Sequence, residues 1–349
     1  MVDWNEHTDV IVVGSGLAGL AAAIEARRAG AGVIVLEKMP ITGGNTRISD
    51  GGIAAPCNYL QQEKGITDSP DLFYDDMRKA GLGLNHPELL RVVADQAAEA
   101  IAWTQDELGV TYLDRLDRFG GHSVARCLTT HSHSGKDIVK AQVDHFRKLG
   151  GEIRTRCMMT AFETHAGGAV CGVRVRRDYR FSKAGSGSEW RIAAARAVVL
   201  ASGGFSSDVE FRKRQDPRLD ASIGTTNHQG ATVEGLVAAL KIGAVPVHLS
   251  WIQTGPWACA DELGYGKGSR FASYSIYPTG ILVDPATGRR IVNEWSDRRT
   301  RADAIIATGH ACVGITDSAG AQQDLPSLEH CLKTGKVRHF ETLPALAAE

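Results

Sequence analysis

The segment that most constrains the fold is residues 8–45, TDVIVVGSGLAGLAAAIEARRAGAGVIVLEKMPITGGN. Residues 9–13 form a short apolar run rich in β-branched side chains, which predicts a strand buried on both faces. Three glycines follow at G-x-G-x-x-G spacing, and residues 20–28 then predict a helix. Residues 33–36 predict a second buried strand that ends at Glu37. This order of elements predicts a βαβ unit that binds a dinucleotide.

Each glycine of the turn has its own role in that prediction. Gly14 permits the tight turn, Gly16 lets a pyrophosphate approach the backbone, and Gly19 lets the helix pack closely on the strand. The N-terminus of the helix presents N–H groups and a partial positive charge to the phosphates. Glu37 can accept both hydroxyls of an adenosine ribose, and its charge disfavours a 2′-phosphate. The alternative interpretation is a glycine-rich turn in an ordinary βαβ unit.

Composition excludes several classes of protein. With 349 residues, 43% of them hydrophobic and 39 of them glycine, the chain fits an α/β enzyme of two domains. A net charge of −1 does not indicate nucleic acid or an anionic membrane as a partner. No apolar run is long enough for a membrane span, and the polar start MVDWNEH does not resemble a signal peptide. Seven scattered cysteines without a C-x-x-C pair predict reduced thiols, no metal site and a cytoplasmic protein.

Two further segments are expected to contact the same dinucleotide. Residues 38–56 show no helix pattern, and their small residues let backbone N–H groups approach a ligand. Residues 197–201, AVVLA, predict a buried strand that ends in small residues, which again permits close backbone approach. The small residues in question are Gly43, Gly44, Gly51 and Gly52 in the first segment and Ser202, Gly203 and Gly204 in the second.

The rest of the chain predicts an alternation of helices and short strands. Helices are expected over residues 71–79, 86–107, 137–149, 231–242 (with Glu234 in its first turn) and 302–308. Strands are expected over residues 152–156, 158–164, 170–177, 190–194, 281–283, 290–292 and 312–316. Residues 251–280 show little periodicity and are interpreted as a linker into a second domain. His131 and His133 lie in a polar loop, where an H-x-H pair without a nearby acid or cysteine is more typical of a solvated loop than of a metal site.

Four blocks of sequence together resemble one family. They are GSGLAGLAAAIEA at 14–26, LEKMPITGGNTRISDGGIAA at 36–55, AVVLASGGF at 197–205 and VNEWSDRRTRADAI at 292–305. Their order and spacing are similar to the fumarate reductase and succinate dehydrogenase flavoproteins, especially the soluble flavocytochrome c-type branch with its urocanate and enoate reductases. The resemblance implies an α/β fold in which residues 1–250 form a Rossmann-like FAD-binding domain with an inserted antiparallel β-sheet. Residues 251–349 would form an incomplete α+β clamp domain that caps the substrate.

The resemblance also implies a cofactor, FAD rather than NAD. The positions expected to bind it are Gly14, Gly16, Leu17, Ala18, Gly19, Glu37, Lys38, Gly43, Gly44, Asn45, Thr46, Gly51, Gly52, Ser202, Gly203, Gly204, Asn227 and Glu234. Family branches with covalent flavin carry a histidine in the loop after the second strand. Residues 43–50 contain none, so the flavin is expected to be non-covalent.

By the same resemblance, the chain would be an oxidoreductase that transfers hydride between flavin N5 and a C=C or CH–CH bond. The substrate would be small and would carry a carboxylate. Arg298 matches the family's proton donor, although a guanidinium gives up its proton only in a dry site with a relay. The alternative for Arg298 is a solvated, charged helix start, because acids and other arginines surround it in the sequence.

Three positions depart from the family's substrate-binding pattern. Gly255 stands where the family has a histidine, and Ala272-Ser273 stands at or near its Thr-Glu pair. The relay arginine corresponds to Ile276 or Tyr277. A dicarboxylate such as fumarate is therefore not the expected substrate. Three aromatic residues would line the pocket if they face it: Trp257, Tyr274 and Tyr277.

A fourth departure concerns length. Family members continue beyond the point that corresponds to Glu349, with a segment that completes the flavin site. A missing C-terminal segment, or a redox partner protein, is therefore an expected partner besides the substrate. One alternative function is a truncated polypeptide that binds FAD or ADP without catalysis. Another is an NAD-dependent dehydrogenase, against which the GGN loop at 43–45 and the ASGG segment at 201–204 argue.

Overall fold

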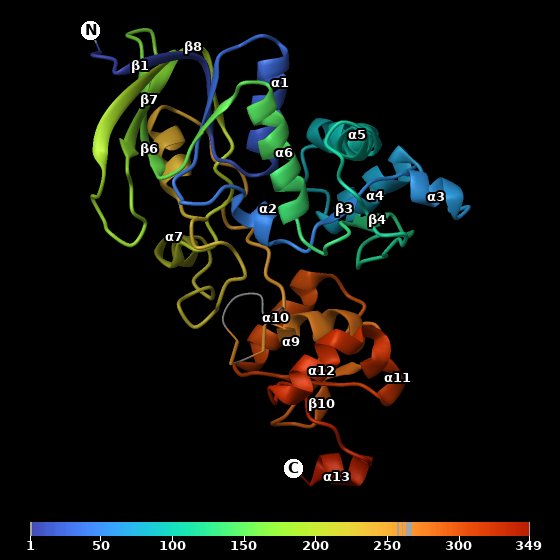
Figure 1. The fold of residues 1–349 in the computed structure, drawn as a ribbon. Coiled ribbons are helices and arrows are strands. Elements are labelled where there is room, and N and C mark those ends of the chain that lie inside the picture. Colours follow the sequence, from blue (N-terminus) through green and yellow to red (C-terminus); the bar gives the residue numbers. More distant parts are fainter. Residues whose placement is uncertain (1, 257, 260, 263–266, 349) are drawn as a thin grey trace. The chain divides into compact units, whose positions relative to one another are not determined.

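The computed structural model describes residues 2–256, 258–259, 261–262 and 267–348, so Trp257 lies outside the described residues. The contacts within the chain divide it into two compact units (Figure 1). Unit 1 contains residues 1–220 and 227–250, and unit 2 contains residues 221–226 and 251–349. The roles expected for residues 1–250 and 251–349 as cofactor and clamp domains remain predictions.

Unit 1 is built on one mixed sheet of six strands (Figure 1). The order across the sheet is β5 (Glu152–Arg154), β2 (Val33–Leu36), β1 (Glu6–Val13), β8 (Ser188–Leu200), β7 (Val170–Arg177) and β6 (Cys157–Thr164). The first four strands run parallel, whereas β7 and β6 are antiparallel to their neighbours. The expected α/β fold with an antiparallel insertion is confirmed, and the insertion extends the parallel sheet.

Strand β8 differs from the prediction of two strands, 190–194 and 197–201. Residues 188–193 pair antiparallel with β7, and residues 192–194 and 197–200 pair parallel with β1, with a register shift at Ala195 and Arg196. The two predicted runs are separated only by Ala195 and Arg196, and neither residue type ends a strand. One long strand therefore connects the antiparallel and parallel parts of the sheet.

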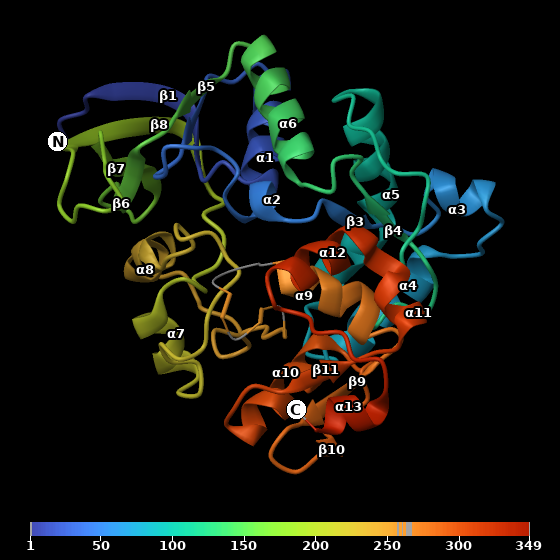
Figure 2. The ribbon, with the colours of Figure 1, turned by 60° about the horizontal axis from the view of Figure 1, so that its bottom comes forward.

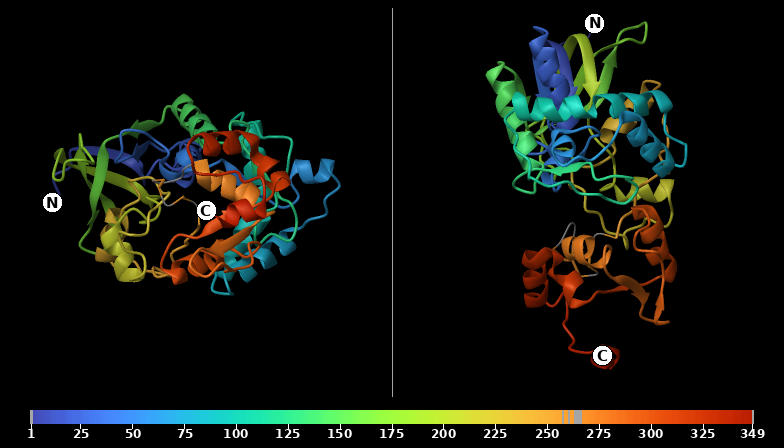
Figure 3. Two further views of the ribbon diagram at one scale, coloured as in Figure 1. Left: turned by 90° about the horizontal axis from the view of Figure 1, so that it is seen from below. Right: turned by 90° about the vertical axis from the view of Figure 1, so that its right-hand side faces the viewer.

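Both faces of the sheet are buried, as the apolar runs of β1 and β2 predict. On one face, Val10 and Val12 pack with Phe146 against α1 (Leu17–Arg28) and α6 (Lys136–Lys148), which lie side by side in Figures 1, 2 and 3. On the other face, Ile11 and Val13 pack with residues of β6, β7 and α8 (Glu234–Lys241). Side chains alternate between the faces because successive residues of a strand point in opposite directions. Each fully buried aliphatic side chain contributes about 1.5–3 kcal/mol.

The remaining elements of unit 1 are short, apart from two helices. They are α2 (Gly44–Ile48), β3 (Gly52–Ala54), α3 (Tyr59–Glu63), α4 (Pro70–Ala80), α5 (Pro87–Asp106), β4 (Cys127–Thr129) and α7 (Val209–Gln215). The expectation of no regular structure in residues 38–56 was wrong, because α2 and β3 lie there. Helix α8 also begins three residues later than predicted, and the Thr232 side chain before it donates to the Gly230 carbonyl and the Glu234 carboxylate.

A buried ion cluster holds the helical part of unit 1 together. Arg126 is 0% exposed, and its guanidinium donates to Asp68 at 2.8 and 2.9 Å and to Asp76 at 2.6 Å. The Phe73 ring lies 4.9 Å from the same guanidinium. Asp68 precedes α4, Asp76 lies within it, and Arg126 precedes β4, so the cluster joins segments about 50 residues apart.

Unit 2 has its own three-stranded sheet and its own core. Its elements are α9 (Lys267–Phe271), a π-helix (Ala272–Ile276), β9 (Ile281–Asp284), β10 (Arg289–Arg290), α10 (Arg298–Thr308), β11 (Val313–Ile315), α11 (Ser318–Ala321), a 3₁₀ helix (Gln322–Asp324), α12 (Leu325–Lys333) and α13 (Leu343–Ala347). Helices α9 and α12 pack together (Figure 2) around Phe271, Ile276 and Cys331. The interpretation of residues 251–280 as a linker was wrong for its second half, which forms α9 and the π-helix.

Helix α10 begins four residues before the predicted start at Ala302. Asp297 caps it, because its side chain accepts hydrogen bonds from the Thr300 backbone N–H at 3.1 Å and the Thr300 hydroxyl at 2.7 Å. None of the helices in the described part of the chain is long and apolar enough to cross a membrane. Within the described ranges, no group of three or more His, Cys, Asp or Glu side chains could hold a metal ion.

Candidate functional site

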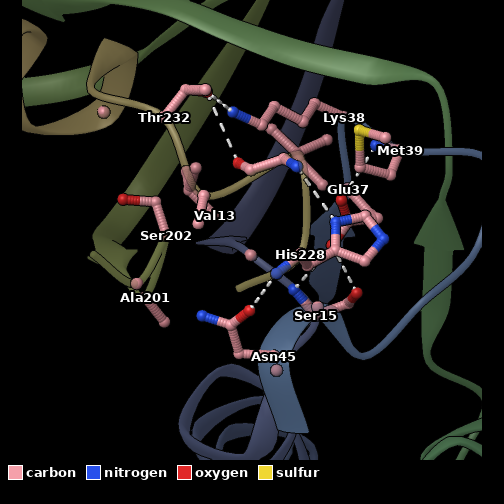
Figure 4. Close-up of a pocket in the computed structure, with 18 of the residues that line it drawn as sticks. Val13, Ser15, Glu37, Lys38, Met39, Asn45, Ala201, Ser202, His228 and Thr232 are labelled. Atoms are coloured by element: carbon pink, nitrogen blue, oxygen red, sulfur yellow. Dashed lines mark hydrogen bonds between the residues drawn. The ribbon is translucent and has the colours of Figure 1, made fainter. Parts of the chain in front are cut away.

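A cavity of about 330 Å³ lies in unit 1 at the carboxyl ends of β1, β2 and β8 (Figure 4). In open α/β sheets, ligands bind in this position. Its wall consists of residues 13–18, 36–39, 44–46, 157–159, 201–204, 228, 230–232 and 234–235. The three segments that the sequence predicts to meet at one dinucleotide therefore line one cavity.

Two of the motif glycines are required by the fold itself. A Cβ atom on Gly14 would lie 2.3 Å from the Ala201 carbonyl oxygen, and Gly14 has a φ of +106°. A Cβ atom on Gly19 would lie 2.0 Å from the Gly14 carbonyl oxygen. Any side chain at these two positions would clash with the backbone. The two glycines therefore allow β1, the end of β8 and α1 to lie in close contact. The packing role expected of Gly19 is thus visible in the structure.

Gly16 is different, because no protein atom requires a glycine there. A Cβ atom on Gly16 would meet the Thr46 Oγ1 at 3.6 Å and the Gly43 carbonyl at 3.9 Å, which are ordinary contacts. Gly16 lines the cavity and precedes the first turn of α1. The space above it is therefore available to a ligand at a helix N-terminus, where anions bind.

Glu37 is held by three donors of the surrounding loops (Figure 4). Its Oε2 accepts from the Ser15 hydroxyl at 2.5 Å and from the Ser15 backbone N–H at 3.3 Å. Its Oε1 accepts from the Met39 backbone N–H at 2.8 Å. A carboxylate has about four acceptor positions, so Glu37 offers one further position to a ligand in this arrangement. The expectation that it accepts both ribose hydroxyls remains a prediction.

A second polar group lies across the cavity from the motif. The Lys38 ammonium donates to the Thr232 hydroxyl and, at 3.0 Å, to the Glu234 carboxylate. Thr232 in turn donates to Glu234 at 2.5 Å (Figure 4 shows Lys38 and Thr232). Burial raises the pKa of Glu234, but the hydrogen bond from Thr232 and the charge of Lys38 outweigh it and hold this pKa below its ordinary value. Glu234 is therefore ionised at neutral pH.

Hydrogen bonds connect helix α2 with the segment before α8. The Asn45 side chain accepts from the His228 backbone N–H at 2.6 Å and donates to the Asn227 side-chain oxygen at 2.6 Å. Thr46 accepts from the Leu17 backbone N–H at 3.1 Å. The two Asn45 contacts join segments about 180 residues apart at the rim of the cavity.

The structure brings most of the predicted cofactor positions to the cavity, but not all of them. Those that line it are Gly14, Gly16, Leu17, Ala18, Glu37, Lys38, Gly44, Asn45, Thr46, Ser202, Gly203, Gly204 and Glu234. Those outside its lining are Gly19, Gly43, Gly51, Gly52 and Asn227. Gly51 faces Thr130 instead, where a Cβ atom would lie 2.2 Å from its hydroxyl. Sequence reasoning missed Ser15, Met39, His228 and Thr232, although Ser15 stands between two motif glycines.

The residues of this cavity fit an FAD. Small residues leave room for the backbone to approach a pyrophosphate, and a Cβ atom on Gly44, Gly203 or Gly204 would meet nothing within 4 Å. The N-terminus of α1 supplies positive potential for phosphates, and Glu37 supplies an acceptor for a ribose hydroxyl. An acid at this position disfavours the 2′-phosphate of NADP.

Arg298 lies in unit 2 as the first residue of α10, and its side chain is exposed. Arg301, one turn further on, is 7% exposed, and its guanidinium lies 4.0 Å from the Tyr277 ring. Its Nε atom is buried and has no hydrogen-bond partner. Burial lowers the pKa of Arg301 below its ordinary value, and the charge of Arg298 acts in the same direction.

The positions that depart from the family pattern are partly buried in unit 2. Ile276 belongs to its hydrophobic core, and its hydrocarbon side chain has no group that could relay a proton. Ser273 donates its hydroxyl hydrogen bond to the Ser269 carbonyl at 3.0 Å. Tyr277 is buried, its hydroxyl donates to the Pro256 carbonyl at 2.6 Å, and burial raises its pKa.

Comparison with known proteins identifies the family. Residues 9–324 match the family described as FAD binding domain. The chain is 42% identical over 353 aligned residues to the acrylate reductase flavoprotein subunit of Shewanella woodyi, covering 99% of this chain and 69% of that protein. It is 37% identical over 259 residues to the urocanate reductase of Eggerthella lenta, covering 73% of this chain and 41% of that protein.

A solved structure agrees with these matches. The open conformation of a flavocytochrome c3 fumarate reductase superposes with a TM-score of 0.76 and 27% identity, covering 93% of this chain and 56% of that chain. The chain thus spans about two thirds of the acrylate reductase subunit, about two fifths of the urocanate reductase and just over half of the flavocytochrome. The chain belongs to the FAD binding domain family and, within it, to the flavoproteins of fumarate reductase type.

Proposed function

We propose that the chain is an FAD-dependent oxidoreductase that reduces the C=C bond of a small carboxylate-bearing substrate. The observation that carries this proposal is the cavity of unit 1, where the glycine turn, Glu37 and the end of β8 meet. The family match supports the same reaction. So do the names of two relatives, an acrylate reductase subunit and a urocanate reductase. Residues 1–250 would hold the cofactor and residues 251–349 would belong to a clamp over the substrate.

FAD bound in the cavity supplies hydride transfer at N5 of its isoalloxazine ring. Glu37 and the first turn of α1 would hold the ribose and the pyrophosphate, and no histidine in residues 43–50 is available for a covalent link. Arg298 would donate the proton that completes saturation of the double bond, and solvent would replace that proton. The position of Arg298 at the start of α10, one turn before the buried Arg301, and its match to the family's proton donor support this role.

The proposed substrate class follows from the family's substrate-binding residues that this chain lacks. Gly255 and Ala272 provide no polar side chain, and Ile276 is buried in the core of unit 2. Fewer groups are therefore available to bind a second carboxylate, which favours a monocarboxylate over fumarate. The name of the 42% identical relative, an acrylate reductase subunit, agrees with a short 2-enoate.

Electrons would come from a redox partner protein. That relative is named as a subunit, and the flavocytochrome is named for its haem-containing class. A cytoplasmic location is also proposed, because all seven cysteines are free thiols in the structure.

The test is the oxidation of photoreduced flavin in the FAD-reconstituted chain. Acrylate should reoxidise the flavin anaerobically and faster than fumarate does. Arg298→Ala should slow reoxidation by about 10²–10⁴-fold, the usual loss of a general acid, while the flavin spectrum stays that of bound FAD. Arg299→Ala is the matched control and should retain most of the rate. Arg299 follows Arg298 in α10, and its guanidinium lies 4.4 Å from the Trp251 ring.

Three results would contradict the proposal. Reoxidation that is unchanged in Arg298→Ala would refute the proton-donor role. Bound FAD that no enoate reoxidises would favour the alternative of an inactive, truncated FAD-binding polypeptide. Binding of NAD in place of FAD would favour the dehydrogenase alternative.

A further inference from the structure

We propose that Ser15 is a positioning residue for the adenosine ribose of the cofactor, and that it acts through Glu37. This inference rests on the proposed FAD site. It assigns a role to the residue between the first two glycines of the motif, a position that the motif itself leaves open.

Ser15 is enclosed completely, with 0% of its surface exposed. Its hydroxyl donates to Glu37 Oε2 at 2.5 Å and accepts from the Gly43 backbone N–H at 3.0 Å. Its own backbone N–H donates to the same Glu37 oxygen at 3.3 Å. One hydroxyl therefore connects the turn after β1, the end of β2 and the loop before α2.

These contacts fix the direction of the Glu37 carboxylate. Oε2 takes both donors from Ser15, and Oε1 takes the Met39 backbone N–H, so both oxygens are constrained. The acceptor position that remains belongs to Oε1, and Glu37 lines the cavity. Without the Ser15 hydroxyl, Oε2 would have a free position and the carboxylate could rotate. Glu37 would then lose the preorganised geometry that makes a hydrogen bond to a ligand favourable.

A purely structural role for Ser15 makes a different prediction. In that case the hydroxyl would serve only to satisfy the buried Gly43 N–H, and its loss would loosen the loop without regard to the ribose. Affinity for every nucleotide would then fall by the same factor. Dependence on the ribose hydroxyls therefore separates the two roles.

The experiment measures binding of ADP and of 2′,3′-dideoxy-ADP to the full chain by isothermal titration calorimetry. The unmodified chain should bind ADP about 10- to 100-fold more tightly than 2′,3′-dideoxy-ADP, as expected for a hydrogen bond to a charged group. Ser15→Ala should reduce this ratio to about threefold or less, because a poorly oriented acceptor discriminates weakly. Ser15→Cys keeps a weaker donor of similar size and should give an intermediate ratio. If Ser15→Ala does not fold, Ser15→Cys carries the test.

The matched control is Ser69→Ala, which removes a hydroxyl that caps α4 outside the cavity lining and should keep the full ratio. A full ratio in Ser15→Ala, or an equal loss of affinity for both nucleotides, would overturn the inference. Equal binding of both nucleotides by the unmodified chain would also overturn it, while leaving the FAD site in place. Failure of the unmodified chain to bind either ADP or FAD would instead refute the proposed function.

Discussion

Two of the buried arginines, Arg126 in unit 1 and Arg301 in unit 2, are compensated in opposite ways. Arg126 in unit 1 is completely enclosed and shares its guanidinium between two carboxylates, Asp68 and Asp76. Arg301 in unit 2 is nearly as enclosed, yet it has an aromatic ring at 4.0 Å and one backbone acceptor, the Glu294 carbonyl, at 3.4 Å. Among the described acids none forms a salt bridge with Arg301.

The difference shows which buried charges hold the fold. Removing one partner of a buried ion pair leaves an uncompensated charge in a medium of low dielectric constant. Without Arg126, the carboxylates of Asp68 and Asp76 would therefore strongly destabilise the fold. Arg301 has no acid to leave behind, and its own desolvation is only partly offset by Tyr277. We therefore expect unit 1 to depend on Arg126 and unit 2 to tolerate the loss of Arg301.

The largest expected effect is that of Arg126→Met. Loss of the guanidinium would leave Asp68 and Asp76 buried without their counter-ion, and the free energy of unfolding should fall by about 3–5 kcal/mol. Urea unfolding followed by far-UV circular dichroism measures this change. Arg91→Met is the matched control, because Arg91 also contacts two acids, Asp71 and Asp95, but at the surface. Its loss should cost far less than that of Arg126, because solvent screens exposed ion pairs. Equal losses in the two variants would contradict the structural role of the cluster.

The counterpart in unit 2 is Arg301→Met. Methionine keeps much of the apolar stem and removes a charge that no described carboxylate balances. The free energy of unfolding should change by less than about 1 kcal/mol, in either direction, in the same urea titration. A loss as large as that of Arg126→Met would show that Arg301 has a compensating partner and would remove the contrast between the units.

The smallest effect concerns Glu234, a partly exposed acid whose charge is compensated at the rim of the cavity. Its folded-state pKa lies below the unfolded value, so its stabilising contribution is fully present above about pH 4.3 and is lost as the pH falls through the folded pKa. Glu234→Gln should therefore make the unfolding midpoint less sensitive to pH below about 4.3. Glu99→Gln, the same change on the exposed side of α5, should not reproduce this. If the unfolding midpoint of Glu234→Gln depended on pH below about 4.3 as that of the unmodified chain does, the compensation of Glu234 by Lys38 and Thr232 would be contradicted.

Much of unit 1 could be predicted from the sequence because its signals are local. Glycine spacing, β-branched runs and the acid after β2 are determined by residues close together in the chain, and they placed the cavity at the correct strand ends. The contacts among Ser15, Glu37 and Gly43, and that of Asn45 with Asn227, could not be predicted. They join residues whose proximity is created only by the fold.

Other errors have the same origin. The two strands predicted at 190–194 and 197–201 form one strand, β8, in which the expected break is only a register shift against β1. Helices α2 and α9 are five residues long, and so short an element carries no readable periodicity. In unit 2, the burial of Ile276 depends on packing with distant residues such as Cys331, and Arg301 lies against the Tyr277 ring. Sequence patterns do not encode these contacts.

The measurement that most directly tests FAD binding in this cavity is a titration of FAD into the chain and into its Gly16→Ala variant. A Cβ atom at residue 16 meets only ordinary contacts with the protein, so the variant should fold with nearly unchanged stability. It should nevertheless lose most of its FAD affinity, because the methyl group occupies the space expected for the pyrophosphate. The unmodified chain should bind one FAD with a shifted flavin spectrum. Equal FAD binding by both chains, or no FAD binding by the unmodified chain, would contradict the account.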